Sequence, residues 1–262
     1  MYENKHFYAV ISKCLFAIVI LFLLACSNNG IKESSVTISG QLKYTSGMKI
    51  YFQELDLQDV KTLDSAIIDL QGKFRFICNS SDEGFYILKL QDGRFVTLLL
   101  KRGENVFIKG DLKRFPGIYE VSGSTGSGLL KEFYDHTTRN KRKGDSLMDI
   151  LHTHQYASDY YKITIAFDTL FQDIWHDQRK FEMNFIDKNI GSLSSLLVLN
   201  YAFGPRPVLS EDIDFNYYLK VDNSMMKLFP RNKHVIYHHK RIAEYQRQLQ
   251  VRKMEADKLH SK

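Results

Sequence analysis

The stretch "KFRFIC", residues 73–78, decides how the first half of the chain is expected to fold. Aromatic and charged residues alternate in it, so that Phe74, Phe76 and Cys78 share one face of an extended strand and the residues between them share the other. The dipeptide Gln71-Gly72 directly precedes it, where a tight hairpin turn needs a residue at positive φ. The pattern predicts a half-buried strand that is entered through a turn.

Similar short stretches lie on both sides of this strand, and turns rich in glycine, Asp and Asn separate them. Asp92-Gly93 marks one more hairpin turn of the same kind. Regularly spaced strands predict an antiparallel β-sandwich or a small barrel over residues 36–123. The further strand candidates are residues 36–44, 48–55, 62–70, 85–90, 94–101, 105–110 and 118–123.

The pattern changes after "SGSTGSG", residues 122–128, because apolar residues then recur at helical spacing. This segment lacks the lysine and final Ser or Thr of a phosphate-binding loop, so we interpret it as a linker. Residues 192–203 are expected to form a buried helix, which Gly204 and the two following prolines would end. The fold class predicted is α+β, with an all-helical region over residues 124–262.

Two further helices are expected near the end of the chain. Ser210 precedes Glu211 and Asp212, which is typical of a helix N-cap followed by a negatively charged first turn. The last helix carries four apolar residues on one face, and an unpaired stripe there would favour a missing partner domain. Those residues are Val235, Ile242, Tyr245 and Leu249.

The amino terminus has the features of an export signal. Two lysines precede an apolar segment of about 12 residues, which is too short to span a bilayer comfortably. The segment ends in Leu23-Leu24-Ala25-Cys26, which resembles the lipobox of bacterial lipoproteins. The resemblance implies that residues 1–25 are a signal peptide, that Cys26 is the lipid attachment site, and that residues 26–35 are a tether. The alternative is an ordinary signal peptide that contains a cysteine by chance.

The lipobox resemblance also implies a location in the cell envelope. Ser27 stands where an aspartate often retains lipoproteins in the inner membrane, and the tether lacks the acidic run that marks surface export in some bacterial groups. We therefore expect a protein that is anchored in the outer membrane and faces the periplasm. The net charge of +6 is spread along the chain, so nucleic acid is not an expected partner. The membrane, through the lipid, and a protein are the expected partners.

Cysteine chemistry is limited in the mature chain. Cys14 leaves with the signal peptide and Cys26 carries the lipid, so only Cys78 remains as a thiol. Its strand position predicts a small hydrophobic residue that faces the core. A redox role would need an exposed thiol with a lowered pKa.

The order of short local motifs resembles the amino-terminal domain of unknown function in envelope lipoproteins that carry a thioredoxin-like, thiol-disulfide oxidoreductase domain. The resemblance covers about residues 36–250. It implies a Cys-x-x-Cys pair after the helices, and this sequence contains none. The motifs that carry it are Ile38-Ser39-Gly40, Asp64-Ser65, Gly72-Lys73-Phe74-Arg75-Phe76, Gly110-Asp111, Val121-Ser122-Gly123-Ser124 and Leu129-Leu130-Lys131-Glu132-Phe133.

Histidines are the main candidates for chemistry. His234 and His238 are four residues apart on an expected helix and can share a face, as metal ligands do, and His239 is adjacent. A third ligand and the glutamate of the metalloprotease motif are absent locally. His152 and His154 are two apart, which separates them on a helix. We expect exposed or capping histidines and no metal site.

The sequence around the other polar candidates also indicates structural roles for them. Asp64 and Asp69 flank an apolar segment and are expected to form turns, and Ser194 and Ser195 lie in no nucleophile motif. Catalytic and cofactor-binding residues are therefore not expected. The sequence predicts a lipid-anchored, non-enzymatic protein with a binding or assembly role. Two alternatives are an accessory or truncated oxidoreductase lipoprotein whose partner supplies the cysteine pair, and a glycan- or peptide-capture protein with an exposed aromatic cleft.

Overall fold

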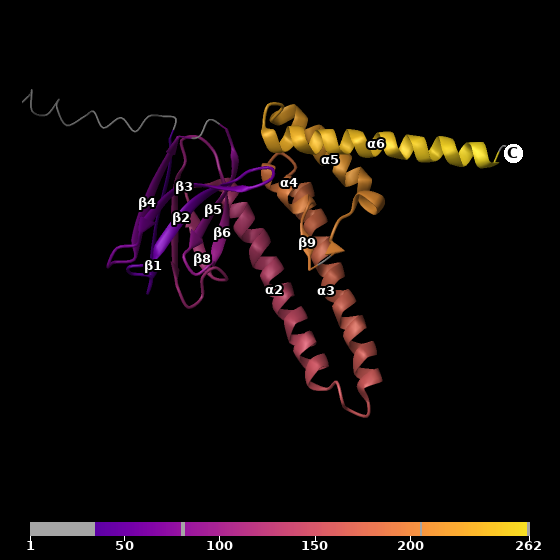
Figure 1. The fold of residues 1–262 in the computed structure, drawn as a ribbon, viewed down its shortest axis with the longest axis horizontal. Helices are drawn as coiled ribbons and strands as arrows, with labels where there is room; N and C mark the ends of the chain where they lie inside the picture. Colours follow the sequence, from indigo (N-terminus) through magenta and orange to yellow (C-terminus); the bar gives the residue numbers. More distant parts are fainter. Residues whose placement is uncertain (1–34, 80–81, 205, 261–262) are drawn as a thin grey trace, which may run out of the picture.

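The computed structural model describes residues 35–79, 82–204 and 206–260. The predicted signal peptide, the attachment site at Cys26 and nearly all of the tether lie outside these residues. The described part contains two four-stranded sheets followed by a helical region (Figure 1). The predicted α+β class is confirmed. The two sheets stay separate, so the sandwich alternative is correct and the barrel alternative is wrong.

The first sheet has the order β4-β1-β7-β8, and the second has the order β3-β2-β5-β6. Every pairing in these sheets is antiparallel except that of β1 with β7, which places Ile38 beside Val106 in parallel register. This parallel pair departs from the expected antiparallel sandwich. The strands are β1 (Ser35–Lys43), β2 (Lys49–Leu55), β3 (Val60–Ile67), β4 (Lys73–Asn79), β5 (Gly84–Leu90), β6 (Phe95–Leu100), β7 (Asn105–Asp111) and β8 (Tyr119–Ser122).

The strand that opened the sequence analysis is β4, and its alternation is confirmed. Phe74 and Phe76 are buried, Cys78 is partly buried, and the residues between them are exposed. The turns before β4 and before β6 hold Gly72 and Gly93 at φ of +77° and +92°. Gly93 lies in a hairpin between β5 and β6, as predicted, but the hairpin predicted at Gly72 is wrong, because the chain crosses there from β3 in one sheet to β4 in the other. Alternation with a period of two residues therefore orients the sheet toward one core.

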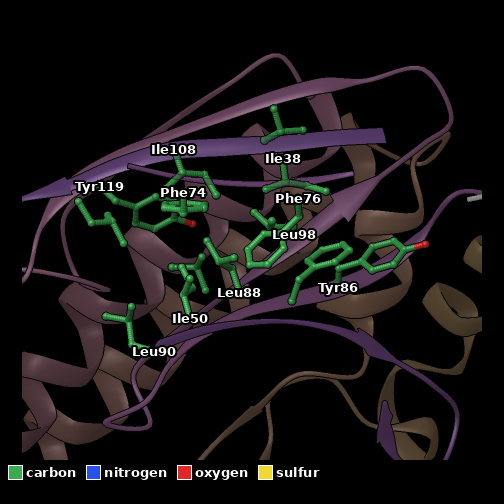
Figure 2. Close-up of a cluster of buried hydrophobic side chains, with 14 of the residues drawn as sticks. Ile38, Ile50, Phe74, Phe76, Tyr86, Leu88, Leu90, Leu98, Ile108 and Tyr119 are labelled. Carbon is green, nitrogen blue, oxygen red and sulfur yellow. The ribbon is translucent and has the colours of Figure 1, made fainter. Parts of the chain in front are cut away.

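The core of the sandwich lies between the two sheets, where side chains from the two layers point toward one another (Figure 2). Phe52 of the second sheet lies 5.7 Å from Phe76 of the first and 5.2 Å from Tyr86 beside it, measured between ring centroids. Leu88, Leu98 and their neighbours are almost fully buried. Aromatic and aliphatic packing across the layers joins the sheets into one unit.

The segment "SGSTGSG" joins the sandwich directly to a helix, so the linker prediction is wrong. Ser124 is the N-cap of α2 (Thr125–Thr153), and its hydroxyl accepts a hydrogen bond from the Ser127 backbone N–H (3.2 Å). The hydroxyls of Ser124 and Ser127 both donate to the Leu99 carbonyl, at 2.9 and 3.0 Å. These serines therefore cap the helix and fasten it to β6.

Replacing Gly123 with alanine is expected to destabilise the protein strongly. Gly123 has a φ of +80°, and an added Cβ would lie 1.8 Å from the Asn105 carbonyl oxygen. The strain of positive φ alone costs about 1–2 kcal/mol, and this clash adds to it. Gly93→Ala is the matched control, because Gly93 has a φ of +92° and open space around it. Urea denaturation should show a larger loss for Gly123→Ala, and equal losses would contradict the proposed clash.

The helical region begins with a long hairpin of α2 and α3 (Tyr160–Lys188), which extends away from the sandwich (Figure 1). The short helix α4 (Leu193–Leu199) follows. The expected helix over residues 192–203 is too long, because Ala202–Phe203 forms β9 and pairs with β10 (Arg206–Pro207). The cause is that the chain must turn back at Gly204, which has a φ of +67°.

Two helices complete the described chain: α5 (Glu211–Leu228) and α6 (Lys233–His260). Ser210 is at the predicted N-cap position of α5, but its side chain makes no capping hydrogen bond; its backbone N–H donates to Asp214 Oδ2 (3.0 Å) instead. Val235 and Ile242 of α6 are buried in the core of the helical region. The first part of the stripe on α6 is therefore paired within the chain, whereas Leu249 is exposed. Among the described residues, we find no helix that combines the length and apolarity needed to cross a bilayer.

Candidate functional site

A cavity of about 360 Å³ is lined by residues of the sandwich, α4 and α6. We call it the histidine pocket, because two imidazoles line it beside a mainly apolar wall. Pockets of this size hold small molecules in other proteins. The lining residues are Leu55, Asp56, Leu57, Phe85, Leu196, Leu197, Asn200, His234, Tyr237, His238 and Arg241.

Polar contacts at the start of α6 hold the two walls of the histidine pocket together. The Lys233 ammonium contacts Glu54 Oε1 at 2.5 Å and Asp56 Oδ1 at 3.0 Å. The Asn232 side chain donates to the Glu83 carbonyl at 2.6 Å. The hydrogen bond from Lys233 lowers the pKa of Asp56. Residues far apart in the sequence thus fix the position of α6 against the sandwich.

His238 is the most unusual side chain of the pocket. It is 3% exposed, and neither ring nitrogen has a hydrogen bond within the described residues. The backbone of Tyr218 lies near the ring but outside hydrogen-bond geometry. Burial lowers the pKa of His238 to about 4, the nearby charge of Arg241 adds to this, and Asp222 opposes it. The imidazole is therefore neutral at physiological pH and can donate one hydrogen bond and accept another.

His234 lies one helical turn before His238 on the same wall. Its ring packs edge-on against Phe85, with 5.1 Å between the centroids, and its Nε2 is buried without a hydrogen-bond partner in the described chain. Burial lowers the pKa of His234, and the charge of Lys233 adds to this effect. The pocket consequently holds two neutral imidazoles with unused hydrogen-bonding capacity. A buried polar group without a partner is rare and destabilising.

The charged groups of the pocket, in contrast, are paired. Arg241 forms an ion pair with Glu211 (2.8 Å from Nε to Oε1), and its Nη2 donates to Asn200 Oδ1. Its guanidinium also lies 5.7 Å from the Tyr218 ring centroid. Asp56 is paired with Lys233, as described above. The buried lining atoms that lack a hydrogen bond in the described residues are therefore the imidazole nitrogens and Arg241 Nε, and of these only Arg241 Nε has an ion-pair partner, Glu211.

The remaining histidine candidates lie elsewhere. His239 does not line the pocket and pairs with Asp222, with 2.9 Å from Nδ1 to Oδ2. His152 is near the end of α2, and His154 is its C-cap, with Nδ1 2.9 Å from the Ile150 carbonyl. In the described part of the chain, no group of three or more His, Cys, Asp or Glu is arranged to hold a metal ion. His234 and His238 could therefore supply only two of the three or more protein ligands that a metal site needs.

The serine and aspartate candidates make structural contacts. Ser194 Oγ donates to Ser192 Oγ (2.9 Å), and Ser195 Oγ donates to the Asn189 carbonyl (2.6 Å). Asp69 accepts from the backbone N–H groups of Gln71 and Lys73, so its turn-forming role is confirmed. Asp64 lies inside β3, next to an irregularity in the pairing with β2, and the turn expected at this residue is absent.

Cys78 and the aromatic residues were also assigned roles from the sequence. Cys78 packs against the sandwich core, as predicted, and burial raises the pKa of its thiol. A smaller aromatic cavity of about 200 Å³ lies beside β9 and β10. Trp175 lines it with a buried indole N–H that has no partner in the described residues. Pro205, which lies between two of the segments that form this cavity, is outside the described residues, so the histidine pocket is the better-defined site.

Arg241, Asn200 and Phe85 contribute to the pocket but were not singled out from the sequence. Each looks ordinary in its local segment, and β5, α4 and α6 meet only in the folded chain. The spacing of His234 and His238 was the one local signal, and it correctly predicted that they share a face.

Part of the chain matches the model of a protein family of unknown function. Residues 36–128 match the family described as "Domain of unknown function (DUF4369)". This match spans the sandwich and the first turn of α2. No curated protein matches the chain.

Two solved structures are similar to small parts of the chain. The 5-hydroxyisourate hydrolase of Klebsiella pneumoniae is 12% identical, with a TM-score of 0.25, and the match covers 35% of this chain and 100% of that one. A DUF3823 family protein from Bacteroides uniformis is also 12% identical, with a TM-score of 0.20, and the match covers 30% and 41% of the two chains. Scores this low support no inference about function.

Proposed function

We propose that this protein is a lipid-anchored cell-envelope protein with a non-catalytic binding role, and that the histidine pocket is its binding site. The observation that carries the proposal is His238, which lines the pocket with two buried ring nitrogens that lack hydrogen-bond partners in the described residues. A ligand would satisfy them. The pocket also lies between two parts of the fold, which is a common position for a ligand site.

The anchoring part of the proposal rests on the sequence. Cys26 follows an apolar segment and a small residue in the arrangement of a lipobox. Two or three acyl chains would hold the protein firmly at the membrane, whereas one chain would hold it only reversibly. In this proposal the protein is attached to the outer membrane and faces the periplasm, and its partners are the membrane and a bound ligand or protein.

The thioredoxin-like envelope lipoproteins provide the alternative. In it, this chain would be an accessory or truncated member of that family, acting with a partner that supplies a Cys-x-x-Cys pair. Two observations favour the binding role instead. The raised pKa and partial burial of Cys78 do not suit thiol exchange, and two of the four stripe residues of α6 that could meet a partner domain, Val235 and Ile242, are buried within the chain.

The variant Cys26→Ala is expected to lose its attachment to the membrane. Wild-type protein should sediment with envelope membranes and be released by detergent, whereas the variant should be found in the soluble fraction. Cys14→Ala is the control, because that residue would leave with the signal peptide. Membrane sedimentation of the Cys26→Ala variant at the wild-type level would refute the anchor.

A further inference from the structure

We propose that the histidine pocket selects a small, uncharged, amphipathic molecule that carries a carboxamide or hydroxyl group on an apolar body. This inference rests on the proposed binding function and adds the chemical class of the ligand. Three features of the pocket support this class of ligand. One wall is apolar, the charged side chains are paired with one another, and two neutral imidazoles lack hydrogen-bond partners in the described residues.

The apolar wall would receive the body of the ligand. Phe85 and Leu196 are its most buried members, at 4% and 6% exposed, while Leu55, Leu57 and Leu197 are more accessible. These residues come from the sandwich on one side and from α4 on the other. Burial of a short alkyl chain or a ring between them would remove apolar surface of both partners from water.

The polar end of the ligand would meet His238 and His234. A neutral imidazole offers one N–H donor and one acceptor nitrogen. A carboxamide or a hydroxyl group also donates and accepts, so it can complement such a ring without a change of protonation. The low pKa of His238 means that the ring keeps this neutral form throughout the physiological range.

The charges around the pocket disfavour an ionic ligand. Lys233 already contacts two carboxylates, those of Glu54 and Asp56, and Arg241 is paired with Glu211. A carboxylate ligand would compete with these acids for the same cations. An ammonium ligand would find the carboxylates of Glu54 and Asp56 occupied by Lys233, and the nearby charge of Arg241 would repel it. Each ionic ligand would also lose its hydration on entry.

Four probes with the same alkyl chain test the inference: hexanamide, 1-hexanol, hexanoate and hexylammonium. Each is titrated into the purified full chain at pH 7.5, and binding is followed by calorimetry and by the imidazole resonances of His238. We expect hexanamide or hexanol to bind at least tenfold more tightly than either ion. Equal or tighter binding of an ion would overturn the uncharged class and leave the binding function standing. Failure of all four probes would also overturn the inference, whereas the binding function is tested independently by ligands from the envelope.

The variant His238→Phe locates the interaction. It keeps a planar ring of similar size and removes both nitrogens, so the affinity for hexanamide should fall at least fivefold. His176→Phe is the matched control, because His176 is exposed on α3 and does not line the pocket. Unchanged affinity in His238→Phe, with native thermal unfolding, would overturn the assignment of the polar end to this ring.

Discussion

The variant Glu182→Gln is expected to be about 5 kcal/mol more stable than the wild type at pH 9 and equally stable at pH 4. Glu182 of α3 is fully buried, and burial raises its pKa from the ordinary 4.5 to about 8. Its Oε1 accepts a hydrogen bond from Gln178 Nε2 (2.9 Å), and its Oε2 has no partner in the described residues. Each pKa unit corresponds to about 1.4 kcal/mol, which gives the size of the effect.

The direction of the effect follows from proton binding. Below pH 4.5, Glu182 is protonated in both the folded and the unfolded chain, so it causes no pH dependence. Between pH 4.5 and about 8, the unfolded chain releases this proton while the folded chain keeps it. The free energy of unfolding therefore falls as the pH rises through this range and is constant above it. Glutamine keeps the hydrogen bond with Gln178 and removes the titration.

Urea denaturation between pH 4 and pH 9 measures this difference. Glu132→Gln is the matched control, because Glu132 is exposed on α2, and that variant should keep the wild-type pH profile. The same profile in Glu182→Gln and in the wild type would show that Glu182 does not retain its proton in the folded protein.

The variant Arg179→Met is expected to lose about 3–5 kcal/mol of stability, because it would leave a buried carboxylate without its partner. Arg179 of α3 donates from Nη1 to Asp214 Oδ2 (2.8 Å) and to the Val208 carbonyl (3.0 Å), and from Nη2 to Asp214 Oδ1. The Asp214 side chain is 4% exposed. Burial alone would raise the pKa of Asp214, but the hydrogen bonds from Arg179 and Ser210 outweigh it and lower the pKa.

A second ion pair between the same helices provides the control. Lys220 of α5 contacts Asp187 of α3 at 2.7 Å, but the two side chains are 50% and 42% exposed. Exposed pairs contribute about 0–1 kcal/mol, so Lys220→Met should have a small effect. Similar losses in Arg179→Met and Lys220→Met, measured by chemical denaturation, would contradict the importance of burial at Asp214.

The β-strands could be predicted from the sequence because their side chains alternate with a period of two and glycines mark the turns. Phe74 and Phe76 showed this for β4, and the structure buries both. The parallel pairing of β1 with β7 could not be predicted in the same way. It depends on which strands of a sandwich become neighbours, and that is determined by packing between the layers.

The errors in the helical half have local physical causes. Glycine-rich "SGSTGSG" looked like a linker, but tertiary hydrogen bonds from Ser124 and Ser127 to Leu99 make it the start of α2. The apolar residues Ala202 and Phe203 continued a helical pattern, but the turn at Gly204 places them in a short hairpin. In the first place, contacts with a distant strand outweighed the low helix propensity of the segment; in the second, a local turn ended the helix.

The histidine pocket, like the fold, could be predicted only in part from the sequence. The four-residue spacing of His234 and His238 predicted a shared face, and both line the pocket. Their burial, the missing hydrogen-bond partners and the pairing of Arg241 with Glu211 depend on β5, α4 and α5, which are remote in sequence. A site assembled from such distant segments becomes visible only when the chain is folded.

The imidazole resonances of the full chain, labelled with ¹³C in its histidine rings, test the binding function most directly. The spectrum is recorded at pH 7.5 before and after addition of a small-molecule extract from the cell envelope. We predict that the signals of His234 and His238 shift while that of His239, on the same helix but outside the pocket, stays in place. If neither pocket histidine shifts with any fraction of the extract, or if His239 shifts equally, the histidine pocket is not the binding site.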